Sequence, residues 1–188
     1  MEHALKLSIL ICHLKERKEQ LSRLLKNLDS QTAGRPIEII VEVDNRGEHS
    51  VGEKRNILLR KAKGEYVSFI DDDDDVSETY VAKILEAIER SHPDCIGITG
   101  KMFVACKGSA LFKHSIVYAG WYESDGVYYR TPNHLNPVRR ELALQVMFND
   151  NMSIGEDRDY SERLIDLIET EEKLDEVIYF YDCTRQMK

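Results

Sequence analysis

The sequence predicts an α/β fold in which a mostly parallel, Rossmann-like sheet is flanked by helices. Apolar runs of strand length, at Leu5–Cys12, Ile37–Val43 and Glu65–Ile70, alternate with segments of helical periodicity or composition. This alternation is typical of parallel sheets whose strands are joined by crossover helices. A length of 188 residues suits one domain, so we expect residues 1–188 to form a single domain.

Three helices are predicted in the first half of the chain. The first and the third carry apolar residues on one helical face, namely Leu21, Leu24, Leu25 and Leu28, and then Val81, Ile84, Leu85 and Ile88. Between them, Glu53–Ala62 has helical composition, with Gly64 placed to end the helix. We expect Ser77 to be the N-cap of the third helix.

The second half is predicted to continue with a strand that starts at Cys95. From about Lys101 the pattern loosens into aromatic, alternating segments, which indicate antiparallel strands or a flap. Helices are expected at Val138–Phe148 and Asp157–Ile168, and a last strand at Val177–Tyr181.

Composition and charge exclude several classes of protein. The longest apolar stretch near the start, Leu7–Cys12, is far shorter than the ~18 residues of a membrane span. Four scattered cysteines without a CxxC pair or a secretion signal argue against zinc and disulfide scaffolds and predict a cytoplasmic protein with reduced thiols. The net charge is −8, and residues 64–188, with 13 basic and 25 acidic side chains, carry the excess. A general nucleic-acid binder is therefore disfavoured, and a cation site in the acidic half is favoured.

The strongest chemical signal is the run of five aspartates at residues 71–75, which directly follows a predicted strand. Adjacent like charges repel unless a cation offsets them, and ligands that are all oxygen suit Mg²⁺ or Mn²⁺ bridging the phosphates of a substrate. The alternative is a solvated acidic loop before the next helix. The run alone favours neither interpretation.

Four segments, taken in order, resemble family-2 glycosyltransferases and their A-type, nucleotide-diphosphosugar-binding fold. They are LSILICHLKER, IEIIVEVDN, GEKRNILLRKAKGEYVSFIDDDD and GEDRDYSERL, which together span most of the chain. The resemblance implies a metal-dependent, inverting glycosyltransferase that moves a sugar from a nucleotide diphosphosugar, with a UDP-sugar favoured, to an acceptor hydroxyl. It also implies that residues 1–100 bind the donor and that residues 101–188 supply acceptor binding and catalysis.

Carried over position by position, the resemblance implies a role for each motif residue. Asp44 is the expected partner of the nucleotide base, and Arg55 contacts the base or the diphosphate. Asp71 and Asp73 are the expected DxD pair that binds Mn²⁺ or Mg²⁺. The neighbours Asp74 and Asp72 are assigned to the metal and to the donor, respectively.

The catalytic base is expected in the acidic pair Glu156-Asp157, with Asp157 favoured. Arg139 and Arg140 are expected to reach the diphosphate, and His134 to serve as an extra metal ligand or an acceptor contact. Trp121 and Tyr122 offer stacking surfaces for a sugar, although aromatic residues on alternating strands are more often core residues. The acceptor is a glycan, a lipid-linked sugar, a protein or a modified nucleobase.

Two other functions remain open on the sequence. A nucleotidyltransferase also combines a parallel sheet with carboxylates and Mg²⁺, but no glycine-rich phosphate loop follows the first strand, where residues 12–17 contain no glycine. A non-catalytic nucleotide-sugar or metal-binding module is compatible with the aspartate run, although the spacing of an EF-hand is missing. Cys12-His13-Leu14-Lys15 also departs from the proline-threonine that often follows the first strand in the family.

Overall fold

The computed structural model describes residues 4–45, 48–104 and 108–182. The predicted α/β class with a mostly parallel sheet flanked by helices is confirmed. The strands are β1 (Leu7–Leu14), β2 (Ile37–Asp44), β3 (Tyr66–Phe69), β4 (Asp75–Val76), β5 (Cys95–Val104), β6 (Gly108–His114), β7 (Tyr122–Ser124), β8 (Val127–Arg130), β9 (Val138–Arg139) and β10 (Glu171–Asp182). The helices are α1 (Lys18–Thr32), α2 (Val51–Lys61), α3 (Tyr80–Ser91), α4 (Arg140–Val146) and α5 (Glu156–Leu164), with 3₁₀ turns at Lys15–Arg17 and Ile165–Leu167.

The sheet has the strand order β2-β1-β3-β9-β5-β6-β8-β7, and β10 pairs with β5 and β4. The strands β2, β1 and β3 are parallel, as the first half of the sequence predicts. The second half is mixed, because the short strand β9 lies antiparallel between β3 and β5, and β5 and β6 form an antiparallel pair. The expected aromatic flap is the antiparallel pair of β7 and β8.

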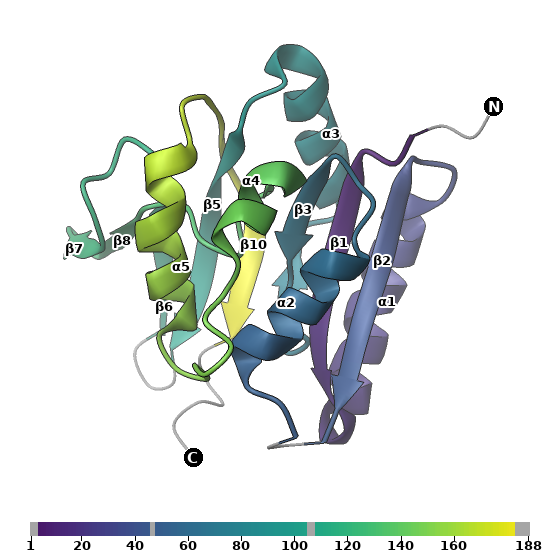
Figure 1. Ribbon diagram of the computed structural model, residues 1–188. Helices are drawn as coiled ribbons and strands as arrows, with labels where there is room; N and C mark the ends of the chain where they lie inside the picture. The colour runs from purple at the N-terminus through teal and green to yellow at the C-terminus, as the bar shows by residue number, and fades with distance from the viewer. Residues whose placement is uncertain (1–3, 46–47, 105–107, 183–188) are drawn as a thin grey trace.

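Helices cover both faces of the sheet, with α2, α4 and α5 on one face and α1 and α3 on the other (Figure 1). Side chains alternate between the two faces along a strand, so Ile9 and Ile11 pack with α1 and α3 while Leu10 packs with α2. Two hydrophobic clusters result, one on each side of the sheet. Because β1, β2 and β3 are parallel, their carboxyl ends lie at the same end of the sheet. Ligands bind at this end in open α/β sheets.

Several predicted boundaries differ from the structure. The N-cap of α3 is Thr79 and not Ser77, whose backbone carbonyl instead accepts a hydrogen bond from the N–H of Tyr80. The helix expected at Val138–Phe148 is shorter, because its first two residues form β9. The last strand begins six residues earlier than Val177, since β10 runs along β5 over most of its length.

Cys12 and Cys95 carry free thiols, whereas Cys106 and Cys183 lie outside the described residues. Among the helices of the described ranges, none combines the length and the apolar character needed to cross a bilayer.

Gly52, in the first turn of α2, positions the segment that leads into α5. A Cβ atom at this position would lie 2.1 Å from the carbonyl oxygen of Asn149, and the N–H of Gly52 donates to the carbonyl of Met152 at 3.0 Å. The side chain of Asn56, one turn further along α2, both donates to and accepts from the backbone of Phe148. Only a residue without a side chain allows this close contact between α2 and residues 148–152.

We predict that Gly52→Ala lowers the free energy of unfolding by about 1–3 kcal/mol, because the new methyl group overlaps a backbone carbonyl that is held in place. Urea denaturation measures this change. Arg60→Ala, at an exposed position of the same helix, is the control and should change stability by less than ~0.5 kcal/mol. Equal stability of the two variants would contradict the close contact.

Candidate functional site

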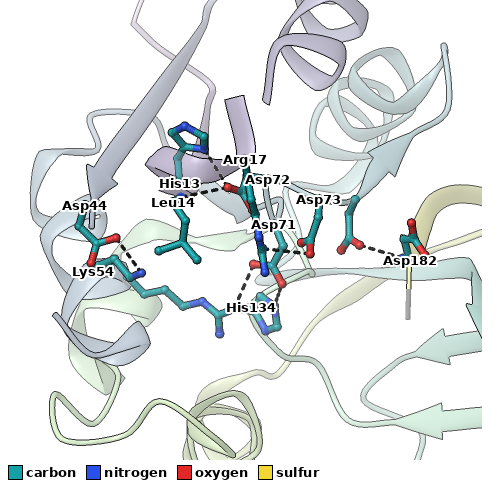
Figure 2. A network of polar contacts seen from close by, with 12 residues as sticks. His13, Leu14, Arg17, Asp44, Lys54, Asp71, Asp72, Asp73, His134 and Asp182 are labelled. Carbon is teal, nitrogen blue, oxygen red and sulfur yellow. Dashed lines mark hydrogen bonds and ion pairs between the residues drawn. The ribbon is translucent and has the colours of Figure 1, made fainter. Parts of the chain in front are cut away.

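A pocket of about 430 Å³ lies at the carboxyl ends of the strands. Its walls come from the end of β1, from α2, from the loop after β3, from the segment after β8 and from the start of α5. The polar residues that line it are Arg17, Lys54, Arg55, Asp71, Asp72, Asp73, His114, Arg130, Asn133, His134, Ser153, Glu156 and Asp157. Residues far apart in the sequence thus share one site, and Figure 2 shows Asp44 and Lys54 on one side of the aspartate run and Asp182 on the other.

The first three aspartates of the run line the pocket and pair with arginines. The guanidinium of Arg55 lies 3.2 Å from an Asp71 oxygen, and that of Arg17 lies 2.8 Å from Asp72 and 2.9 Å from Asp73. Burial raises the pKa of Asp73, and the charge of Arg17 offsets this only in part. The repulsion within the run is therefore relieved first by arginines of the chain itself.

The last two aspartates of the run face away from the pocket. The buried Asp74 accepts hydrogen bonds from the hydroxyl of Tyr179 at 2.7 Å and from the backbone N–H of Asp182 at 2.9 Å, and burial raises its pKa well above the ordinary value. Asp75 accepts from the amide of Asn27 on α1. The expectation that Asp74 shares the metal is thus not met by this geometry, because its oxygens point to β10.

Arg55 is a buried cation, 3% exposed, that joins the two acidic motifs. Its guanidinium donates to Glu156 at 2.8 Å as well as to Asp71. It also lies between the rings of Phe69 and Phe148, at 5.7 and 5.4 Å from their centroids. Desolvation raises the pKa of Asp71, but the contributions of Arg55 and His134 together outweigh this effect and hold that pKa well below its usual range. These two carboxylates hold the guanidinium at the pocket wall, and its contact to a base or a diphosphate stays a prediction.

The two carboxylates at the start of α5 differ in their surroundings. Glu156 is 6% exposed and paired with Arg55. Asp157 is half-buried and lines the pocket, and its Oδ1 accepts a hydrogen bond from the N–H of Arg158 at 2.9 Å. Among the described residues, no cationic side chain pairs with Asp157. Of the two, Asp157 is the carboxylate available to a ligand.

Asp44 ends β2 as predicted and is 2% exposed. Its Oδ1 lies 3.1 Å from the ammonium group of Lys54, which lines the pocket, while its Oδ2 is buried without a hydrogen-bond partner in the described part of the chain. A buried acceptor without a donor is costly, so this oxygen is suited to a donor group of a ligand.

His134 lines the pocket, is 7% exposed and has no hydrogen-bond partner on either ring nitrogen among the described residues. Its Nε2 lies 3.8 Å from Asp71, too far for a direct hydrogen bond (Figure 2). Within residues 4–45, 48–104 and 108–182, no group of three or more His, Cys, Asp or Glu side chains is arranged to hold a metal ion.

The structure does not bring Arg139 and Arg140 to the pocket. Arg139 lies opposite Tyr66 at the amino end of β3 and pairs with Asp94. Arg140 donates to the carbonyl of Gly64 at 3.0 Å. Asp71 follows the carboxyl end of the same strand, so these arginines are at the opposite edge of the sheet. The prediction that these arginines contact the diphosphate is therefore wrong. The sequence pattern does not reveal strand β9, which places both residues at the amino end of β3.

Sequence reasoning misses three cationic residues of the pocket wall: Arg17, Lys54 and Arg130. The first two belong to the basic turn LKER and to the GEKRN segment, so their place in these motifs could have identified them as site residues. Arg130 ends an aromatic strand, and nothing in that pattern distinguishes it from a solvated arginine.

Comparisons with known proteins identify a family from the sequence and a fold from solved structures. The sequence model of the family "Glycosyl transferase family 2" matches residues 43–152, a range that includes Asp44, Arg55, the aspartate run and His134 but ends before Glu156. No curated protein matches the chain in sequence.

Among solved structures, the chain is similar to residues 1–349 of S. aureus TarS, with a TM-score of 0.69 and 17% identity over 95% of this chain and 60% of that one. The complex of TarS 1–349 with UDP-GlcNAc gives a TM-score of 0.70 at 17% identity, with 95% of this chain and 58% of that chain covered. A longer TarS structure gives 0.66 at 15% identity, with 95% and 37% covered. The chain therefore spans about three fifths of the length of TarS 1–349 and shares its fold.

We predict that Arg55→Met lowers the free energy of unfolding by about 3–5 kcal/mol, because it leaves Asp71 and Glu156 in the pocket without their shared cation. The measurement is urea denaturation at neutral pH. Arg60→Met makes the same change of charge and shape at an exposed site on α2 and should have little effect. If the two variants are equally stable, the Arg55 ion pairs contribute nothing to the fold.

Proposed function

The chain belongs to glycosyl transferase family 2, and on that premise we propose that it transfers a sugar from a nucleotide diphosphosugar to an acceptor hydroxyl. A UDP-sugar is the favoured donor. We also propose that the chain acts as one domain, in which residues 1–100 bind the donor and residues 101–188 bind the acceptor and hold the catalytic base.

One observation carries the proposal. The same pocket contains a carboxylate without a cationic partner, Asp157, and the aspartates Asp71 and Asp73 at the carboxyl end of β3. Glycosyl transfer needs a proton acceptor beside the acceptor hydroxyl and neutralisation of charge on the departing diphosphate. One cavity thus offers a candidate proton acceptor in Asp157 and, in Asp71 and Asp73, two carboxylates that would hold a divalent cation beside the diphosphate.

The donor is proposed to lie across β2, β1 and β3. The unpartnered Oδ2 of Asp44 is suited to accept a hydrogen bond from the N–H of a nucleotide base, and uracil carries such a group. TarS 1–349, which has the same fold, has been crystallised with UDP-GlcNAc and with UDP, and this supports a UDP-sugar. Lys54 and Arg17, on the pocket wall, are cations near the proposed path of the diphosphate.

Asp71, Asp73 and His134 suit a divalent metal. Mg²⁺ and Mn²⁺ commonly take one or two protein carboxylates and complete their coordination with substrate phosphates and water, so three converging protein ligands are not required. Asp73 keeps a raised pKa beside Arg17, and His134 has two buried ring nitrogens without partners among the described residues. When bound, Mn²⁺ or Mg²⁺ would neutralise charge on the nucleoside diphosphate as it leaves.

The proposed reaction inverts the configuration at the anomeric carbon. Asp157 accepts the proton of the acceptor hydroxyl, whose oxygen forms the new bond to that carbon while the bond between the carbon and the phosphate oxygen breaks. The electron pair of the broken bond leaves with the nucleoside diphosphate. Glu156, which is held by Arg55, keeps the start of α5 in place.

A screen of nucleotide diphosphosugars tests the proposed function. Release of free UDP from a UDP-sugar distinguishes a transferase from a binding module. Release of pyrophosphate from UTP would indicate a nucleotidyltransferase instead. The acceptor panel should contain glycans, lipid-linked sugars, proteins and modified nucleobases.

We predict that Mn²⁺ and UDP raise the melting temperature more together than the sum of their separate effects, because a divalent ion held by Asp71 and Asp73 would also attract the diphosphate. Differential scanning calorimetry with each ligand alone and with both measures this coupling. Asp73→Asn should abolish the coupling, whereas Asp75→Asn, which faces α1, should keep it. Additive shifts in the wild type would contradict the metal bridge.

We predict that Asp157→Asn lowers the rate of UDP release in the presence of acceptors by about 10²–10⁴-fold, because the amide cannot accept the proton. Donor affinity should persist, since the shape of the side chain is kept. Glu156→Gln is the matched control. It should lower the free energy of unfolding, because it weakens the ion pair with Arg55, but should leave the rate of UDP release nearly unchanged. Near-normal turnover by Asp157→Asn together with inactive Glu156→Gln would assign the base to Glu156.

A further inference from the structure

Four arginine and lysine side chains line the pocket, and Arg130 differs from the others. Lys54 pairs with Asp44, Arg55 with Asp71 and Glu156, and Arg17 with Asp72 and Asp73. Within the described ranges, no carboxylate lies at ion-pair distance from Arg130. In a chain with a net charge of −8, a pocket cation without an acidic partner is a candidate for binding an anion.

Arg130 is held in place by an aromatic ring. Its guanidinium carbon lies 4.4 Å from the ring centroid of Trp121, and the indole N–H of Trp121 is within 3.2 Å of the hydroxyl oxygen of Thr131 and 3.3 Å of that of Ser161. Ser161 belongs to α5, the helix that starts with the acidic pair. Stacking fixes the plane of the guanidinium and leaves its edge N–H groups for a ligand.

A second polar group of the same wall also lacks a partner. Asn133 is fully buried, its Oδ1 accepts a hydrogen bond from the N–H of Leu135 at 3.0 Å, and its Nδ2 has no partner among the described residues. An amide nitrogen is a donor only, so this group too is suited to an oxygen of a ligand. The buried His114 nearby is neutral, because burial and the charge of Arg130 lower its pKa to about 3, and it adds no competing charge.

The position of this wall indicates which substrate it meets. Arg130 ends β8, which lies near one edge of the sheet, whereas Asp44 ends β2 at the other edge, with β1 and β3 beside it. A donor that spans Asp44 and the aspartate run leaves the β8 side of the pocket for the acceptor. Trp121 joins this side to α5 and hence to the helix of Asp157.

We propose that Arg130 and Asn133 form a subsite that binds an anionic group, a carboxylate or a phosphate ester, on the acceptor. The inference rests on the proposed transferase function, and it narrows the acceptor to acidic sugars and phosphorylated glycans. The guanidinium of Arg130 and the amide nitrogen of Asn133 both line this pocket, and each can donate a hydrogen bond to an oxygen of an anion.

The test uses the full chain saturated with UDP and Mn²⁺, and three probes titrated by ligand-observed NMR: glucose 6-phosphate, glucuronate and glucose. We expect saturable binding of at least one charged probe and none of glucose at the same concentrations. Arg130→Gln should weaken binding of the charged probe by about tenfold or more and leave UDP affinity within about twofold. Arg60→Gln, with the same loss of charge at an exposed site, should leave both unchanged.

Four results would overturn the subsite. If Arg130→Gln lowers UDP affinity and the charged probe competes with UDP, Arg130 serves the diphosphate of the donor. If Arg130→Gln weakens binding of the donor UDP-glucuronate, titrated separately, but not of the free charged probes, the anion belongs to the transferred sugar. Equal binding of glucose, or no effect of Arg130→Gln, removes the anion subsite. Failure of the wild type to bind UDP overturns the proposed function itself, and a titration of the probes without UDP then shows whether Arg130 still binds an anion.

Discussion

The structure depends on one buried cation. Arg55 reaches from α2 to Asp71 after β3 and to Glu156 at the start of α5, and these two carboxylates are 85 positions apart in the sequence. The rings of Phe69 and Phe148 exclude water around the guanidinium, so the attraction acts in a medium of low polarity and the loss of one partner is costly. Because Glu156 is fixed in this way, its neighbour Asp157 is left to line the pocket. The contact between Arg55 and Glu156 therefore contributes both to stability and to the position of the candidate base, Asp157.

The aspartate run illustrates how a linear motif becomes a site with several functions. Its carboxylates contact partners from the turn after β1, from α1, α2 and β10, and from the segment after β8. Two pocket charges remain without an opposite charge among the described residues: the carboxylate of Asp157 and the guanidinium of Arg130. Arg130 lies on the β8 side of the cavity, and Asp157 belongs to the helix that Trp121 joins to that side. The other charged side chains of the pocket, by contrast, are paired with opposite charges.

The sequence predicts the parallel half of the fold well, because each strand there is a compact apolar run and each helix carries a clear apolar face. It also predicts Asp44 at the end of β2 and the grouping of Asp71, Asp73, His134 and Asp157 on one pocket. The failures have physical reasons. The two-residue strand β9 is too short to leave a periodic signal, so Arg139 and Arg140 were assigned to the wrong edge of the sheet. The direction of Asp74 is set by Tyr179, which is distant in sequence, and the stacking of Arg130 on Trp121 depends on a strand pairing that composition does not encode.

The hydrogen bond between Trp121 and Ser161 has a consequence for protein engineering. The indole of Trp121 contacts α5 from the start of the β7–β8 hairpin. The surface proposed to select the acceptor is thus packed directly against the helix that carries Asp157. Exchanging the hairpin for that of another enzyme, in order to change acceptor specificity, would therefore disturb the helix unless the graft retains a tryptophan at position 121. Chimaeras designed within this family should treat residues 121–131 and α5 as one module.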